Sequence, residues 1–241
     1  MKIEALYPEF CQWFGDSENL RYLKMCLPEA EFIETGSCDQ PAFVDGSVDL
    51  VVLGSMTERQ QLAAAERLMP YRDRLRERIE AGMAVLATGN STELFGEFIA
   101  EEGVRYPMLS LFPFHAERDM EARHNSMFLG EFEDMKIVGY RAQFSVLRGD
   151  FPGDFIKVLG GIGNSLGDRN EGFRYKNLFG TYLLGPFLIL NPPFTRYLLR
   201  LLGREEPLAF EQAVTEAYDY RLEGLESKQA KFFFGESGWL E

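Results

Sequence analysis

The chain has 241 residues with 25 basic and 38 acidic side chains, which gives a formal net charge of −13. Hydrophobic residues make up 46% and charged residues 26%, a globular balance that excludes a mostly disordered chain. The acidic excess argues against nucleic acid as a partner, because phosphate groups need a basic surface. No apolar run approaches the ~20 residues that span a bilayer, and Glu4 and Glu9 interrupt the region where a signal peptide would be apolar.

Histidine and cysteine are scarce, and this limits the chemistry that the chain can perform. The two histidines are His115 and His124, and the three cysteines are Cys11, Cys26 and Cys38. They form no C-x-x-C pair and no cluster, so no metal site and no cofactor are expected. An odd number of cysteines without a signal peptide predicts reduced thiols and a cytoplasmic protein.

The first hundred residues predict an alternation of strands and helices. Strands are expected at residues 2–7, 31–34, 48–54 and 83–88, and helices at 20–27, 57–82 and 92–99. Asp16 or Ser17 is expected to cap the first helix, and Pro70 to break the second into two. Residues 89–91 form a tight turn, and Ser91 or Thr92 is expected to cap the helix that follows. The alternation predicts βαβ units, and therefore a doubly wound, mostly parallel sheet flanked by helices.

The second half of the chain predicts antiparallel additions to that sheet. A hairpin is expected from residues 127–132 and 135–140, with further strands at 155–159 and 178–184. Helices are expected at 194–203 and 210–234. The simplest division is one domain over residues 1–203 and a C-terminal helical extension, 204–241, packed on it. The aromatic cluster at 231–234 is expected to dock on the domain, with an interface as the alternative.

Two groups of motifs in this chain resemble one family. Near the start are Leu6-Tyr7-Pro8, Phe14-Gly15-Asp16 and Asn19-Leu20. Later come Gly163-Asn164, Asp168, Glu171-Gly172, Lys176-Asn177, residues 180–183, Gly185-Pro186 and Asn191-Pro192. In order and spacing they resemble the class I glutamine amidotransferases of the cobyric acid synthase type, in particular the glutaminase subunits of lipid II isoglutaminyl synthase. The resemblance covers residues 1 to about 202 and implies a flavodoxin-like, three-layer α/β fold.

The resemblance also implies a chemistry. In that family a cysteine on a strained turn between a strand and a helix attacks the glutamine amide, and a histidine transfers the proton. The helix N-terminus lowers the pKa of the thiol and helps to hold the oxyanion.

This chain departs from the family at the residues that carry the chemistry. Gly89 stands where the cysteine belongs, and Leu184 where the histidine belongs. Gly54 is followed by Ser55-Met56 rather than by the glycines of the oxyanion loop. Residues 139–143 read GYRAQ in place of a G-F-E-N-H-like segment. Because losing the nucleophile or the base removes nearly the whole covalent advantage, on the order of 10⁶ in rate, glutamine hydrolysis by the family mechanism is not expected.

We therefore expect a degenerate pocket lined by Gly54, Ser55, Gly89, Asn90, Ser91 and Leu184. The chain would act as a non-catalytic partner subunit or a small-molecule-binding module. The resemblance implies a Mur-ligase-like synthetase as its partner. The alternatives are an active amidotransferase or hydrolase with a rebuilt site, in which Ser91 or Thr88 replaces the cysteine, and a homo-oligomeric structural protein.

Other residues that could carry chemistry have simpler interpretations. Cys11 is interpreted as a buried core thiol, and the two histidines as solvated or packing residues. The loop at residues 160–164, GGIGN, lacks the lysine of a P-loop and is interpreted as a structural turn. Arginines alternate with acidic residues over 72–78, which favours a solvated, salt-bridged helix face, with a partner surface as the alternative.

Overall fold

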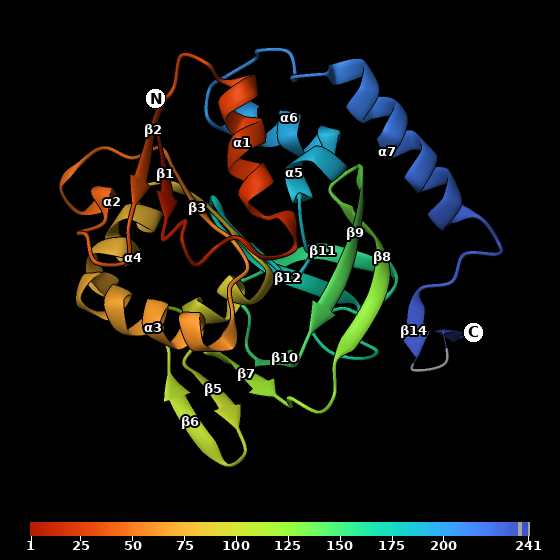
Figure 1. Ribbon diagram of the computed structural model, residues 1–241, viewed down its shortest axis with the longest axis horizontal. Helices are drawn as coiled ribbons and strands as arrows, with labels where there is room; N and C mark the ends of the chain where they lie inside the picture. The colour runs from red at the N-terminus through yellow and green to blue at the C-terminus, as the bar shows by residue number, and fades with distance from the viewer. Residues whose placement is uncertain (236–237, 241) are drawn as a thin grey trace.

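The computed structural model describes residues 1–235 and 238–240 and shows a three-layer α/β fold (Figure 1). A large mixed sheet runs through the middle, with helices against both of its faces. A smaller sheet projects from one end, where Figure 1 labels β5 and β6. Within the described residues, no helix is long and apolar enough to cross a membrane.

Five parallel strands form the half of the large sheet that holds the candidate site. In spatial order they are β2 (Glu31–Thr35), β1 (Lys2–Leu6), β3 (Leu50–Leu53), β4 (Ala84–Thr88) and β13 (Leu178–Thr181). The strand order reverses between β1 and β3. Open α/β sheets bind ligands outside the carboxyl ends of the strands at such a reversal, so this edge is where a site belongs.

The central strands are buried on both faces. In β3, Leu50 and Val52 pack into one apolar cluster, while Val51 and Leu53 pack into another on the opposite face. The strand β4 alternates in the same way. This confirms the interpretation of the β-branched run as a strand of a covered parallel sheet.

Helices supply the other side of each cluster. One face is covered by α1 (Ser17–Cys26), α5 (Phe187–Leu190) and α6 (Pro192–Leu201). The other face is covered by α2 (Ala42–Asp45), α3 (Glu58–Leu68) and α4 (Arg72–Glu80). The 3₁₀ turn η2 (Met69–Tyr71) separates α3 from α4, which confirms the break predicted at Pro70. The expected α/β fold is therefore confirmed.

Antiparallel strands extend the sheet beyond β13, as expected. They are β12 (Asn170–Tyr175), β11 (Asp154–Gly160) and β8 (His124–Phe132), and β9 (Met135–Gln143) forms the predicted hairpin with β8. Near the C-terminus, β14 (Phe233–Gly235) pairs with β8 and β15 (Gly238–Leu240) pairs with β14. The helix α7 (Glu211–Glu226) packs on β8 and β9, with Tyr218 against Leu129 and Val138.

The smaller sheet was not predicted. Its order is β10 (Ser145–Gly149), β7 (Phe114–Arg118), β5 (Phe98–Glu101) and β6 (Val104–Pro107). The helix expected over residues 92–99 is wrong, because the 3₁₀ segment η3 (Gly89–Phe95) ends there and β5 begins at Phe98. Ser91 and Thr92 explain the failure, since their hydroxyls donate to the carbonyls of Thr88 and Ala87 instead of capping a helix.

One further expectation needs correction. The helix expected over residues 210–234 ends at Glu226, and Ser227 is already extended. Phe232 then packs against the Leu129–Val138 cluster, and its carbonyl accepts a hydrogen bond of 2.8 Å from Met127 N. The side chain of Phe234 and residue Glu241 lie outside the described part of the chain.

Candidate functional site

The turn after β4, where the family resemblance places a nucleophile elbow, has a glycine in a left-handed conformation. The strand ends at Thr88, and Gly89 follows with a left-handed φ of 61°. Only glycine adopts this conformation without steric strain. The position that the family gives to its cysteine therefore keeps the sharp turn while lacking any side chain.

Ser55 and Leu184 fill the space around this turn. A Cβ atom on Gly89 would overlap Ser55 Oγ, and it would lie 2.9 Å from Ser55 Cβ and 3.2 Å from Leu184 Cδ2. The fold thus brings three of the predicted pocket residues together. Any side chain at position 89 would require Ser55 to move.

The position of the family's histidine holds a buried aliphatic side chain. Leu184 is 1% exposed, and its backbone N donates a hydrogen bond of 2.9 Å to Tyr140 O in β9. An isobutyl group neither accepts nor releases a proton, so this position cannot act as a general base.

Asn90 ties the elbow to the loop that follows β3. Its Oδ1 accepts a hydrogen bond of 3.0 Å from Met56 N, and its Nδ2 donates one of 2.8 Å to Met56 O. The carbonyl of Asn90 accepts a hydrogen bond of 2.6 Å from Gln61 Nε2 of α3. Asn90 thus connects the elbow to the backbone of Met56 and to Gln61 of α3.

The backbone amides of Ser55 and Met56, in the loop after β3, also have hydrogen-bond partners. Ser55 N donates a hydrogen bond of 2.6 Å to Asp16 Oδ2, and Met56 N donates to Asn90. An oxyanion hole needs backbone donors that point at the developing charge. Here the side chains of the protein itself take up both donors.

Asp16 organises this edge of the sheet, a role that its sequence position did not predict. It was expected to cap α1, but it makes no side-chain capping bond there. Its carboxylate accepts hydrogen bonds from Ser55 N, from Thr88 Oγ1 at 3.0 Å and from Asn19 Nδ2 at 3.3 Å. Burial raises the pKa of Asp16 to about 6. The sequence signal was its place in the Phe14-Gly15-Asp16 motif.

The hydroxyl groups at the elbow form hydrogen bonds with backbone carbonyls. Ser91 Oγ donates to Thr88 O at 2.8 Å and lies 3.2 Å from Leu53 O. Thr92 Oγ1 lies 3.0 Å from Thr181 O. These carbonyl oxygens are hydrogen-bond acceptors that do not take up a proton, so the contacts lock the turn and do not activate Ser91 as a nucleophile.

A buried network of charged groups lies behind the elbow. Glu93 Oε2 accepts hydrogen bonds from Gln61 Nε2 at 2.9 Å and from Arg118 Nη2 at 3.0 Å. Tyr182 donates its hydroxyl to Glu93 Oε1 at 3.0 Å. The side chains of Glu93 and Arg118 are 0% and 1% exposed, so this is a fully desolvated ion pair. Residue spacing gave no sign of it, because its members come from four separate segments.

Ser145 joins that network to a second buried arginine. Arg118 Nε donates to Ser145 Oγ at 3.4 Å, and Arg141 Nη2 donates to Ser145 O at 2.9 Å. The guanidinium of Arg141 also lies over the ring of Tyr182, 4.3 Å from its centroid. Burial lowers the pKa of Arg141, and the anionic groups around it act in the opposite direction.

Glu171 anchors β12 to the end of β13. Its carboxylate accepts hydrogen bonds from Thr181 Oγ1 at 2.7 Å and from Tyr182 N at 2.6 Å. Burial raises its pKa to about 7, against the effect of these bonds and of Arg141. The Glu171-Gly172 motif noted in the sequence therefore has a structural role.

The remaining candidates lie apart from the elbow or are inert. Cys11 is buried, and burial raises the pKa of its thiol to about 12. His115 lies in β7, stacked on Phe98 with 4.6 Å between ring centroids. His124 lies in β8 opposite Gln143, and burial lowers its pKa.

The glycine-rich loop and the arginine-rich helix have structural roles. Asn164 exchanges two hydrogen bonds with the backbone of Gly172, at 3.1 and 2.7 Å. On α4, Arg72 pairs with Asp73 and Arg74 with Glu77. In the described residues, no three His, Cys, Asp or Glu side chains are grouped as metal ligands.

One cavity lies beside the loop after β3, and Gly54 is the one residue of the predicted pocket among those that line it. It measures about 320 Å³ and lies at the reversal of strand order, between the ends of β1 and β3 and the start of α1. Cys11, Asp16, Val52 and Gly54 are among the residues that line it.

Comparisons with known proteins agree with this architecture. Two curated relatives are the GatD subunits of lipid II isoglutaminyl synthase (glutamine-hydrolyzing). The one from Staphylococcus aureus (strain N315) is 30% identical over 164 residues, which span 68% of this chain and 67% of the relative. The one from Streptococcus pneumoniae (strain ATCC BAA-255 / R6) is 26% identical over 203 residues, which span 79% and 76%.

Solved structures show the same fold. A glutamine amidotransferase structure is 18% identical with a TM-score of 0.56, covering 83% of this chain and 98% of that one. Another, from Thermotoga maritima, is 12% identical with a TM-score of 0.53, covering 94% and 99%. The profile of the CobB/CobQ-like glutamine amidotransferase domain matches residues 2–191. The chain belongs to the CobB/CobQ-like glutamine amidotransferase family.

Proposed function

We propose that this chain is a glutamine amidotransferase-like subunit without glutaminase activity, which acts as the non-catalytic partner of a Mur-ligase-like synthetase. The observation that carries the proposal is the occupied elbow. The nucleophile position is Gly89 in a left-handed turn, and Ser55 Oγ takes the space where a side chain would begin.

Two further features of the site support the loss of hydrolysis. Leu184 lies 3.2 Å from the place of a Cβ on Gly89, where the family's cysteine and histidine would face each other. The amides of Ser55 and Met56 are bound to Asp16 and Asn90. A site without nucleophile, base and free oxyanion donors lacks each means of stabilising the transition state that the family uses.

The nearest replacement nucleophile does not rescue the chemistry. The two backbone carbonyls that Ser91 Oγ contacts do not act as general bases. An active serine hydrolase would need a histidine or carboxylate within about 3 Å of that oxygen. This geometry disfavours Ser91 as the nucleophile of a rebuilt active site. The other candidate, Thr88, does have a carboxylate nearby, because its Oγ1 lies 3.0 Å from Asp16 Oδ2. Thr88 is only 1% exposed, however, and the same carboxylate oxygen already accepts a hydrogen bond from Ser55 N, which disfavours Thr88 as well.

The partner is proposed from the relatives. Both curated relatives are named as subunits of a glutamine-hydrolysing synthase that acts on lipid II. A chain that keeps their fold without the catalytic groups retains surfaces with which a subunit binds its partner. We infer that this chain pairs with a synthetase of that class in the cytoplasm.

A glutaminase assay tests the loss of activity. The purified chain is incubated with L-glutamine, alone and with the Mur-ligase-like synthetase of the same organism, and glutamate release is measured. The GatD subunit of Staphylococcus aureus serves as the active control. We expect release at the level of buffer alone, and turnover that rises in proportion to the amount of this chain would overturn the proposal.

A further inference from the structure

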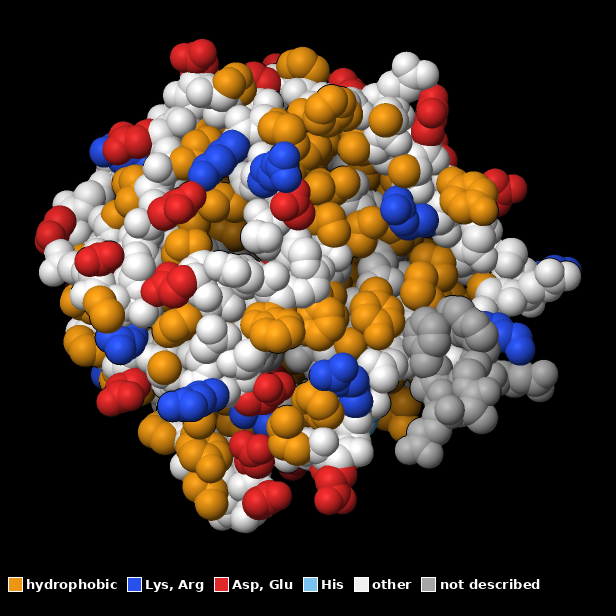
Figure 2. All heavy atoms as spheres, in the orientation of Figure 1, with side chains coloured by type: hydrophobic (Ala, Val, Ile, Leu, Met, Phe, Trp, Pro, Cys, Tyr) orange, Lys and Arg blue, Asp and Glu red, His pale blue; other side chains and the backbone are white. Residues whose placement is uncertain are grey.

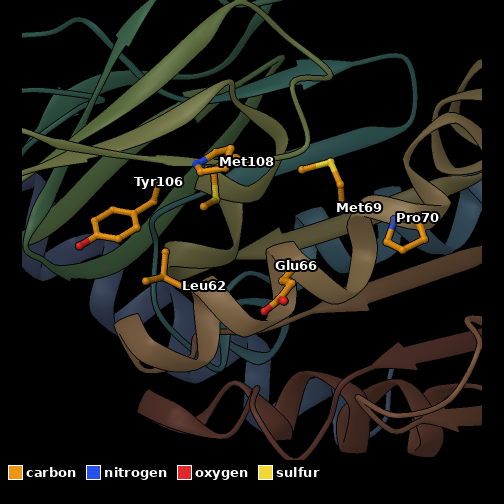
Figure 3. A pocket seen from close by; sticks show the side chains of 7 residues that line it. Leu62, Glu66, Met69, Pro70, Tyr106 and Met108 are labelled. Carbon is orange, nitrogen blue, oxygen red and sulfur yellow. The ribbon is translucent and has the colours of Figure 1, made fainter.

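An apolar groove lies between α3 and the β5–β6 hairpin (Figure 3). It measures about 610 Å³ and is lined by Leu62, Glu66, Met69, Pro70, Tyr106, Pro107 and Met108. Figure 3 shows Leu62 and Glu66 on the helix and Tyr106 and Met108 across from them. Hydrophobic side chains also reach the surface over this hairpin, at the lower left of Figure 2.

The lining combines an adaptable apolar surface with one free charge. Met69 is half-buried, and its side chain is flexible and polarisable, a property common in surfaces that bind protein segments. Met108 is 1% exposed and belongs to the core beneath the groove. Glu66 is exposed and is the single charged residue of the lining. Among the residues that the structure describes, no lysine or arginine forms an ion pair with Glu66. The groove therefore favours an apolar segment that carries a positive charge.

Both walls of the groove are attached to the elbow. On one side, Gln61 of α3 donates a hydrogen bond of 2.6 Å to Asn90 O. On the other, Leu109 N donates to Leu94 O at 3.0 Å and Leu111 N to Phe95 O at 3.1 Å. The segment η3 thus fixes the separation of the two walls, although it holds no nucleophile.

We propose that this groove seats a segment of the synthetase partner that presents apolar side chains and one lysine or arginine to Glu66. This inference rests on the proposed function and names the surface through which it operates. It gives the elbow a role that needs no catalysis, because the η3 backbone holds the two walls apart. A second copy of this chain is the poorer occupant, since two chains of charge −13 repel each other.

Two groove variants and one matched control test the assignment. Glu66→Lys reverses the single charge at the rim of the groove, and Leu62→Asp places a charge on its apolar wall. Glu29→Lys makes the same charge change at another exposed position. The affinity of each full-length variant for the synthetase is measured by calorimetry, with the melting temperature as a check of folding.

We expect each groove variant to raise the Kd at least about tenfold, while Glu29→Lys leaves it within about twofold of wild type. Glu66→Lys changes an exposed side chain, so its folding is secure even if Leu62→Asp destabilises α3. Raising the salt concentration should narrow the difference between wild type and Glu66→Lys, because ion pairs at a rim are screened.

Three results would overturn the assignment, and they separate it from the proposed function. If wild type binds the synthetase and Glu66→Lys binds equally well, the groove is not the binding surface, but the proposed partner is correct. If wild type binds no synthetase at all, both the proposed partner and the assignment of the groove are wrong. If wild type forms a dimer that Glu66→Lys or Leu62→Asp dissociates, the groove belongs to a second copy of the chain.

Discussion

Thr88 Oγ1 donates a hydrogen bond of 3.0 Å to Asp16 Oδ2, so the last residue of β4 is tied to the loop that follows β1. The same carboxylate oxygen accepts from Ser55 N after β3. One buried carboxylate therefore joins the ends of three neighbouring strands. The edge that would hold a substrate in an active relative is held together here by the protein's own side chains.

Stability should decrease as pH rises through the range in which the buried acids ionise. The pKa of Glu171 is about 7 in the folded chain, against ~4.3 in an unfolded one. The folded state therefore binds more protons between about pH 4 and 7, and the free energy of unfolding falls by about 3 kcal/mol from this group as pH rises. Asp16, with a pKa of about 6, acts in the same direction.

Glu171→Gln isolates this effect, because it removes the titration and keeps an oxygen for Tyr182 N. The stability of the variant relative to wild type should rise by about 3 kcal/mol between pH 4.5 and pH 8. Urea unfolding at a series of pH values measures it. Parallel pH profiles for the two proteins would show that Glu171 does not titrate in this range.

Removing Arg118 should destabilise the chain strongly. Arg118→Met leaves Glu93 charged, buried and unpaired, at a cost of about 3–5 kcal/mol in the free energy of unfolding. Adding Glu93→Gln should recover part of this loss, since it removes the orphaned charge. Arg59→Met, at an exposed position, is the control and should lie within about 0.5 kcal/mol of wild type. Equal losses in the single and double variants would contradict the ion-pair interpretation.

A cysteine at position 89 should not by itself restore glutaminase activity. Gly89→Cys places a Cβ in a left-handed turn against Ser55, so we expect a loss of about 2–4 kcal/mol in stability and no glutaminase activity. The triple variant Gly89→Cys, Ser55→Gly, Leu184→His clears the space and supplies a base. It should release glutamate measurably, though far more slowly than an active relative, because Met56 N remains bound to Asn90. Activity in the single variant would show that Ser55 does not block the position.

Ser91 should matter for folding only. Ser91→Ala removes the hydrogen bond to Thr88 O and should lower the free energy of unfolding by about 1 kcal/mol. Affinity for the synthetase should not change. A fluorophosphonate probe, which labels activated serines, should leave the wild-type chain unmodified, and labelling abolished by Ser91→Ala would identify Ser91 as a nucleophile after all.

Much of the fold could be predicted because its signals are local. The run from Val48 to Leu53 and the break at Pro70 depend on residue type and spacing, and both predictions are confirmed. The structure of the segment after Gly89 could not be predicted from residue type and spacing. Its helical spacing competes with hydroxyl-to-carbonyl bonds that exist only once β4 and β13 lie side by side.

The contacts around Gly89 could not be predicted from the sequence. The family motifs located Gly89 and Leu184, and the fold brings the two close together. Asp16 does stand at the N-cap of α1, but its side chain makes no capping bond and turns to positions 55 and 88, which could not be predicted because they are remote in sequence. The Glu93–Arg118 pair was missed for the same reason, since neither residue carries a local pattern that marks it as buried.

The hydroxyl of Ser145 accepts a hydrogen bond from Arg118 and its carbonyl accepts one from Arg141, and Ser145 is the first residue of β10 in the smaller sheet. Because Arg118 belongs to the smaller sheet and its partner Glu93 is buried outside it, the smaller sheet cannot detach without leaving Glu93 without its cation and breaking the bond from Arg141 to Ser145. Amide hydrogens in β7 and β10 should therefore exchange with solvent deuterium only in the same global opening that frees β4. The two sheets would then unfold as one cooperative unit.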